Sequence, residues 1–234
     1  TELINDSDTD FVVLTYKDNE ALDLSIIKEI EKAKEKALTS TYWANWWSVY
    51  GLGNVGSLQG TVFENWQQCD AIPKDAEFIA YGMDFGFTND PSTLIAVYRY
   101  NGELYLNELI YQTKLTNSDL ISRLKELNVT PQQMIVADSA EPKSIEDLRR
   151  AGFRIEGAKK GADSIRNSID TLQAFKLNVT KSSINLIKEL RNYKWVTDND
   201  GKHTSQPIDS YNHGIDGIRY VALNRIKKTT FIIE

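Results

Sequence analysis

The chain has 234 residues, of which 41% are hydrophobic and 26% are charged. This size allows one full domain with an extension or two small domains, and the composition supports a buried core, which excludes a largely disordered chain. Its 27 basic and 33 acidic residues give a net charge of −6 and argue against a domain that grips nucleic acid by bulk charge alone. One cysteine and two histidines exclude an internal disulfide and Cys-rich or His-rich metal sites, so any metal site must depend on carboxylates.

The sequence shows neither a signal peptide nor a transmembrane segment. It begins at Thr1 without a basic and apolar leader, and no window approaches 18 consecutive apolar residues. We therefore expect a protein that is not secreted and does not act at a membrane. An initial threonine also suggests a piece of a longer chain, or a processed one.

Residues 1–75 are predicted to form an N-terminal helical and aromatic extension. Asp23 is a suitable N-cap for a helix, whose apolar stripe consists of Ile26, Ile30, Ala33 and Ala37. The stretch 41–66 then holds four of the five tryptophans among several glycines. Such a stretch is typical of a segment that packs on a surface, either that of its own domain or that of a partner.

From residue 77 the hydrophobic pattern becomes regular. Strands are predicted at Glu77–Asp84, Thr93–Tyr100, Glu103–Tyr111, Gln133–Asp138, Phe153–Ile155, Leu177–Val179 and Tyr193–Val196. Helices are predicted at 117–127, 143–150, 164–175, 182–193 and 209–227. Three antiparallel strands followed by alternating strands and helices predict an α/β fold, with a mixed sheet of five or more strands and helices on both faces. A ribonuclease H-like arrangement fits this order.

Two nucleotide-binding motifs in the sequence are misleading. Gly51–Gly56 reads GxGxxG and Asp84–Gly86 reads DFG, which together suggest a protein kinase. No His-Arg-Asp loop exists, however, and the chain between Lys74 and Asp84 is too short for a catalytic lobe. The GxGxxG motif follows an aromatic run rather than a strand, which excludes a dinucleotide site. A P-loop is absent, so we expect no ATPase activity from this chain.

Two aspartates, by contrast, occupy informative positions. Asp84 ends one apolar run and Asp138 ends another, so each carboxylate is expected at the carboxyl end of a buried strand. Burying a carboxylate costs free energy unless it is paired or binds a metal ion. One such aspartate is usually a turn former or a helix cap; with two in one domain, that interpretation and a functional pair stand as equal alternatives.

The predicted last helix supplies a third acidic position. The spacing of Asp209, His213, Asp216 and Tyr220 places all four on one helical face. The neighbouring face is apolar and would dock on the sheet; it consists of Ile215, Ile218, Ala222 and Ile226. A histidine and an aspartate one turn apart can be a surface pair, but together with two strand-end aspartates they suit Mg²⁺ or Mn²⁺, which prefer oxygen ligands.

Three segments resemble the acidic motifs of a known family, the nuclease domain of the large terminase subunit of tailed bacteriophages. They are YGMDFGFTNDPSTLIAVY (81–98), IVADSAEPKSIEDLRRAGF (135–153) and PIDSYNHGIDGIRYV (207–221), in the family's order. The resemblance covers roughly residues 77–225. It implies a ribonuclease H-like domain at 76–228 with a tail at 229–234. TYKDN (15–19) and GTVFENW (60–66) resemble the end of the family's ATPase part and its connector.

The resemblance also implies an activity and a site. A metal-dependent endonuclease would cut concatemeric double-stranded DNA during genome packaging, with two Mg²⁺ or Mn²⁺ ions about 4 Å apart. Asp84 would bridge the ions, Asp138 would bind one, and Asp216 with His213 would bind the other. The phosphate contacts suggested by clustered basic residues are Lys143, Lys159, Lys160 and Arg166.

The implied partners are an ATPase domain, the small terminase subunit and the portal, in the cytoplasm of an infected bacterium. Two other functions remain open at this point. A resolvase or transposase-type nuclease could share the fold and the three aspartates. A docking module of the packaging motor could retain the acidic residues without catalysis.

Overall fold

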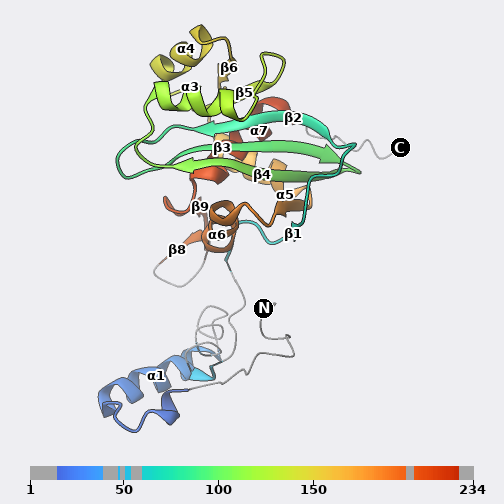
Figure 1. Cartoon of the computed structure of the whole chain (residues 1–234). Helices are drawn as coiled ribbons and strands as arrows, with labels where there is room; N and C mark the ends of the chain where they lie inside the picture. The colour runs from blue at the N-terminus through green and yellow to red at the C-terminus, as the bar shows by residue number, and fades with distance from the viewer. Residues whose placement is uncertain (1–14, 39–46, 48–50, 54–59, 199–202, 227–234) are drawn as a thin grey trace. The chain divides into compact units, whose positions relative to one another are not determined.

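The computed structural model describes residues 15–38, 47, 51–53, 60–198 and 203–226 (Figure 1). The chain forms two compact units: residues 1–60 with 195–204, and residues 61–194 with 205–234. The first unit contains a 3₁₀ turn at Tyr16–Asp18 and helix α1 (Leu24–Lys36). Asp23 caps α1 as predicted, since its side chain accepts a hydrogen bond of 2.7 Å from the Ser25 amide. Most of the tryptophan-rich stretch 41–66 and part of the GxGxxG motif lie outside the described residues.

The second unit is built on a seven-stranded mixed sheet, which confirms the predicted fold class. Its strands run in the order β1-β7-β4-β3-β2-β5-β6. Their bounds are β1 (Trp66–Cys69), β2 (Glu77–Asp84), β3 (Ser92–Tyr100), β4 (Glu103–Gln112), β5 (Met134–Ala137), β6 (Arg154–Gly157) and β7 (Leu177–Thr180). β3 is antiparallel to both its neighbours and every other pair is parallel. The carboxyl ends of the other six strands therefore meet at one edge of the sheet.

Two parts of this architecture differ from the sequence prediction. β1 lies within the range 1–75 that was assigned to the extension, yet it pairs with β7 as an edge strand. Its sequence, WQQC, lacks the alternation that signals a strand, and the pairing depends on a partner far along the chain. The strand expected at 193–196 is β8 (Trp195–Thr197), which pairs with β9 (His203–Pro207) in a separate two-stranded sheet.

Helices cover both faces of the sheet. One face packs against α3 (Asn117–Glu126) and α4 (Pro142–Arg150), and the other carries α5 (Ser164–Gln173), α6 (Ile184–Asn192) and α7 (His213–Arg225). In Figure 1, α3 and α4 lie above the sheet, and α5 and α6 lie below it. No helix in the described ranges is long and apolar enough to cross a membrane.

Helix α7 packs as the sequence predicted, but it begins later. Its apolar face is fully buried, with Ile215, Ile218, Ala222 and Ile226 all at most 5% exposed. The helix starts at His213, not at Asp209. Tyr211 adopts a left-handed backbone conformation, with φ of 57°, that a helix cannot accommodate. Asp209 is therefore in the preceding loop, where its carboxylate accepts a 3.3 Å hydrogen bond from Asn212 Nδ2.

A glycine pair lets α7 cross β2 at very short range. A Cβ atom added to Gly82 would lie 2.1 Å from the Gly217 carbonyl oxygen, and one added to Gly217 would lie 3.0 Å from the Gly82 oxygen. The backbones of strand and helix are thus in direct contact, which no larger residue at position 82 allows. This contact positions the N-terminal turn of α7 at the carboxyl end of β2.

We predict that Gly82→Ala destabilises the protein by about 1–3 kcal/mol, because the new methyl group must push the α7 backbone away. Gly217→Ala should destabilise the protein less, because its added Cβ makes a longer contact. Alanine is also more favourable than glycine inside a helix, by about 1 kcal/mol. Thermal melts measure both effects, at about 2–4 °C per kcal/mol for a chain of this size. Gly161→Ala is the matched control, as nothing lies within 4 Å of its added Cβ. A Gly82→Ala melt equal to that of Gly161→Ala would contradict the prediction.

Candidate functional site

The two strand-end aspartates lie side by side. Asp84 is the last residue of β2, Asp138 directly follows β5, and the two strands are parallel neighbours with Met83 opposite Ala137. The Asp138 amide donates a 3.3 Å hydrogen bond to the Met83 carbonyl. Side chains alternate along a strand, and Met83 and Ala137 belong to the core under α3 and α4. Asp84 and Asp138 consequently point to the opposite face, which carries α7.

Tyr220 of α7 joins these two carboxylates. Its hydroxyl lies 3.3 Å from Asp84 Oδ1 and 3.2 Å from Asp138 Oδ2. Burial raises the pKa of Tyr220, and the negative charges of Asp84, Asp216 and Asp138 raise it further. The same three carboxylates that the sequence singled out thus surround one buried phenol.

Asp216, in the first turn of α7, joins Asp84 and Asp138 to form the acidic group. Arg219, one turn further along, donates a hydrogen bond to its Oδ1, while Arg219 Nε donates a 3.0 Å hydrogen bond to Ser168 Oγ on α5. Burial raises the pKa of Asp216 to about 7 even though Arg219 opposes the shift. A carboxylate with this pKa is poorly compensated, and a further cation would stabilise its ionised form.

His213 is the first residue of α7 and lies between two carboxylates. Its Nδ1 is 3.6 Å from Asp84 Oδ2 and its Nε2 is 3.6 Å from Asp90 Oδ1. The contact with Asp84 raises the pKa of His213. Burial raises the pKa of Asp84 in turn, against the opposing effect of His213. The Thr93 hydroxyl, on β3, donates a 3.2 Å hydrogen bond to the His213 carbonyl and holds this end of the helix to the sheet.

Asp138 differs from the other carboxylates because a lysine neutralises it. Lys160 Nζ lies 2.5 Å from Asp138 Oδ1 and 4.8 Å from the centre of the Tyr220 ring. Burial raises the pKa of Asp138, but the Ala140 amide and Lys160 outweigh that effect, so the net shift is downward. In this structure Lys160, which the sequence suggested as a phosphate contact, is an ion-pair partner within the acidic group.

The sequence reasoning missed Glu189 on α6. It is 1% exposed, and its carboxylate accepts hydrogen bonds from the Ile215 amide at 3.0 Å and the Tyr111 hydroxyl at 2.9 Å. An anion at this end of α7 is favoured by the helix dipole, and the contact anchors the turn that carries His213 and Asp216. The sequence does contain a signal for this residue, because Glu189 is a charged residue inside the otherwise apolar stripe of the predicted helix 182–193.

The donor set fits divalent metal ions. Carboxylate oxygens with one imidazole suit Mg²⁺ and Mn²⁺, and the raised pKa values of Asp84 and Asp216 reflect buried negative charge that a cation would compensate. Within the described ranges, no three His, Cys, Asp or Glu side chains are close enough together to hold one ion. Asp138 and Asp216 instead form separate ion pairs, with Lys160 and Arg219 respectively.

A cavity of about 880 Å³ lies beside Asp138 and Asp216, whereas Asp84 is not among its lining residues. Asp138, Asp216 and Tyr220 line it together with the start of α5 and the loop 206–212. Of the four predicted phosphate contacts, Lys160 and Arg166 line this cavity, whereas Lys143 and Lys159 do not. Arg166 also forms a 2.9 Å ion pair with Asp170.

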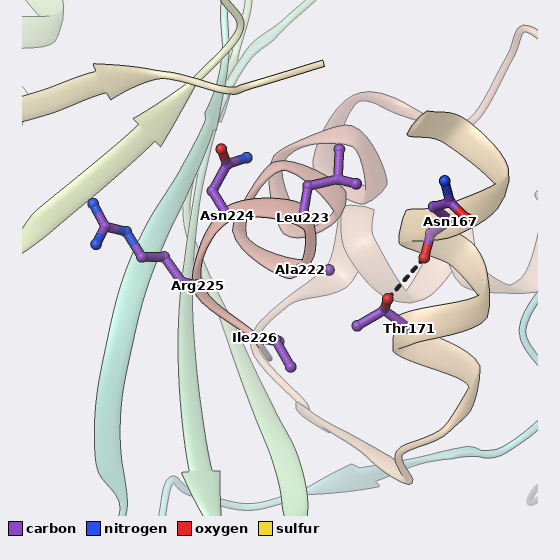
Figure 2. A pocket seen from close by; sticks show the side chains of 7 residues that line it. All are labelled: Asn167, Thr171, Ala222, Leu223, Asn224, Arg225 and Ile226. Atoms are coloured by element: carbon purple, nitrogen blue, oxygen red, sulfur yellow. Dashed lines mark hydrogen bonds between the residues drawn. The ribbon is translucent and has the colours of Figure 1, made fainter. Parts of the chain in front are cut away.

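A second hollow, of about 580 Å³, lies at the other end of α7 (Figure 2). It is lined by residues 222–226 and by Asn167 and Thr171 of α5, which are joined by a 2.7 Å hydrogen bond from the Thr171 hydroxyl to the Asn167 carbonyl. None of its lining residues is acidic, and its one cation, Arg225, pairs with Glu156 at 2.5 Å. Of these two cavities, the first has the side chains for metal-dependent chemistry.

Comparisons with known proteins agree with this geometry. The family described as "Terminase RNAseH like domain" matches residues 84–223. The large terminase subunit of Bacillus phage SPP1 is 31% identical over 229 residues, and the PBSX phage terminase large subunit of Bacillus subtilis is 28% identical over 218 residues. These matches cover 92% and 91% of this chain but only 52% and 50% of the relatives. The chain thus spans about half the length of the curated relatives it matches.

A solved structure supports the same assignment. The nuclease domain of the SPP1 large terminase, crystallised with bound Mn, is 30% identical with a TM-score of 0.60, covering 68% of this chain and 96% of that domain. The P22 large terminase nuclease domain shares the fold at 14% identity, with a TM-score of 0.53. The family match extends over more than half of the chain and begins at Asp84 itself. The chain belongs to the family of ribonuclease H-like nuclease domains of phage large terminase subunits.

Proposed function

We propose that this domain hydrolyses phosphodiester bonds of double-stranded DNA with divalent metal ions and cuts concatemers during genome packaging. The observation that carries the proposal is the grouping of Asp84, Asp138 and Asp216 around Tyr220 at the edge of the sheet. The family assignment and the Mn bound to the SPP1 relative support it.

In this proposal, Asp84, Asp138, Asp216 and His213 hold two Mg²⁺ or Mn²⁺ ions. Bound there, the ions would lower the pKa of the attacking water, stabilise the leaving 3′ oxygen and offset the phosphate charge. Water adds to phosphorus, the bond from phosphorus to the 3′ oxygen breaks, and the 3′ oxygen gains a proton.

The surrounding residues set the positions of these ligands. Tyr220 orients Asp84 and Asp138 through one hydroxyl. Arg219, itself fixed by Ser168, holds Asp216 toward the same cavity. Such fixed neighbours keep the carboxylates from turning into solvent and lower the reorganisation needed when ligands bind.

The partners of the whole protein belong to the same proposal. An ATPase domain, the small terminase subunit and the portal would assemble with this chain in the cytoplasm of an infected bacterium. Since the chain matches about half of its relatives' length, the ATPase is expected in the remaining part. A plasmid digestion separates the nuclease from a docking module without catalysis.

We predict that Asp84→Asn abolishes cleavage of plasmid DNA in Mg²⁺ or Mn²⁺, while wild-type cleavage stops in EDTA. The same variant should melt at an equal or higher temperature in EDTA at pH 7–8. The reason is that the pKa of Asp84 is raised above 3.8 in the folded state, so ionisation of this side chain destabilises the fold as pH rises. The gain in melting temperature should shrink as the pH falls and vanish at about pH 3 or below, where the carboxylate is largely protonated in both the folded and the unfolded state.

Asp75→Asn is the matched control for charge, because Asp75 is exposed and forms no ion pair with a described residue. It should retain wild-type cleavage and melting. Cleavage at the wild-type rate by folded Asp84→Asn protein would exclude the proposed metal mechanism.

We predict a different pattern for the two candidate ligands on α7. Asp216→Asn should reduce cleavage at least 100-fold with either ion, since it removes an anionic oxygen ligand. His213→Ala should reduce cleavage more with Mn²⁺ than with Mg²⁺, because imidazole suits Mn²⁺ better. Cleavage rates in each ion, normalised by the folded fraction, measure both effects. An equal loss with both ions would show that His213 acts through Asp84 rather than as a ligand.

A further inference from the structure

The edge of the sheet that holds the carboxylates continues past them on the β4 side. Thr93 of β3 stands opposite both Asp84 of β2 and Tyr111 of β4. β4 and β2 therefore end level with each other, two strands apart. The chain that leaves β2 carries Phe87, and the chain that leaves β4 carries Lys114, so both residues lie at this edge.

One hydrogen bond ties these two residues together. The Lys114 amide donates to the Phe87 carbonyl at 2.7 Å. The loop around Phe87 is also pinned from within, because the Ser92 hydroxyl lies 3.2 Å from the Gly86 amide and 2.7 Å from its carbonyl. A Cβ atom added to Gly86 would lie 2.4 Å from the Asp90 carbonyl oxygen, so the turn has no room for a side chain at this position.

The side chains of Phe87 and Lys114 are nevertheless exposed to solvent. Phe87 is 55% exposed, although the fold buries most of its large apolar residues. Lys114 is exposed and makes no ion pair with any described residue. The acidic neighbour on the loop, Asp90, faces His213 at 3.6 Å. An exposed apolar ring and an unpaired lysine on two loops joined through their backbones have the chemistry of a nucleic-acid contact, in which the cation meets a phosphate and the ring meets a sugar or base edge.

We propose that Phe87 and Lys114 contact duplex DNA on the β4 side of the carboxylates, so that the duplex crosses the carboxyl ends of the strands. This inference rests on the proposed nuclease function. The basic residues suggested by the sequence follow β5 or β6, on the other side. Among them Lys159 is the matching contact, because it follows β6 and its side chain forms no ion pair within the described part of the chain.

The spacing of these contacts suits a duplex that is cut between them. β4 and β6 are four strand spacings apart in the sheet, which is about 19 Å at about 4.8 Å each. At about 3.4 Å per base pair, that distance covers roughly six base pairs. Asp84 ends β2 and Asp138 follows β5. These two strands lie between the two contacts, so a phosphate over the carboxylates is held from both sides.

The test measures binding of a fluorescent 20-base-pair duplex by anisotropy, in EDTA and in an Asp84→Asn background that cannot cut. The parent should show a log–log salt slope of about −2 to −4, as for three or four phosphate contacts. Lys114→Ala should make the slope shallower by about 0.9 and weaken binding about eightfold at 0.1 M salt. Phe87→Ala should weaken binding about fivefold with the slope unchanged, because apolar contact releases no counterions. Phe87→Leu should retain most of the affinity.

Lys125→Ala is the matched charge control. Lys125 is exposed and unpaired among the described residues, but it lies eight residues into α3, about 12 Å along the helix from its start at the sheet edge. It should bind like the parent. If Lys114→Ala and Phe87→Ala also bind like the parent, the contact surface proposed here is wrong.

Cleavage kinetics of the same variants in protein that keeps the native Asp84 provide a second measurement. With Mn²⁺, Lys114→Ala and Phe87→Ala should raise KM with little change in kcat, whereas Lys125→Ala should change neither. Should the wild type neither bind nor cut any duplex, the proposed nuclease function itself fails. Should it cut while the two variants keep wild-type KM, only the placement of the duplex fails.

Discussion

The close contact between Gly82 and Gly217 is the constraint on which the site depends. Because neither residue has a side chain, β2 and α7 touch backbone to backbone, with a Cβ at position 82 only 2.1 Å from a carbonyl oxygen. That approach brings the first turns of α7 to the end of β2. Asp216 and His213 could not approach Asp84 if a normal side chain separated the two elements. A steric property of two glycines thus determines the spacing of acidic groups that the sequence places far apart.

The site concentrates buried negative charge, and the protein compensates only part of it. Lys160 neutralises Asp138 and Arg219 opposes the shift of Asp216, yet burial still raises the pKa values of Asp84 and Asp216. The fold tolerates this cost because the core beneath the site, with Met83 and Ala137 among its residues, is fully buried. Buried carboxylates with raised pKa values cluster at functional sites, and a bound cation would offset their charge.

The mixed topology of the sheet explains why so many functional groups share one edge. Every strand of this sheet except β3 has its carboxyl end at that edge. The first residues of the loops that follow these strands therefore lie along the same edge. Asp84 and Asp138 leave adjacent strands, while Lys114 and Lys159 leave strands further out. A duplex that crosses this edge would meet basic or apolar groups at its flanks and carboxylates in the middle.

The local sequence determined the elements and the chemistry of the site. Continuous apolar runs defined the strands that end in Asp84 and Asp138, and helical spacing predicted the buried face of α7, because such patterns depend on neighbours within a few residues. Predictions that depended on an unusual backbone were less accurate. The left-handed Tyr211 shortens the last helix and places Asp209 in a loop.

Tertiary structure alone decided what these residues touch. The role of Glu189 as the anchor of α7, the pairing of Lys160 with Asp138 and the addition of β1 to the sheet all join positions at least 22 residues apart. A single sequence can mark one member of such a pair as unusual, as it does Glu189, but it contains no local signal for the partner, since the contact arises only when the sheet assembles. The sequence therefore determines which acidic side chains the site contains, whereas their ion pairs and their spacing follow from how the helices, strands and loops pack against one another.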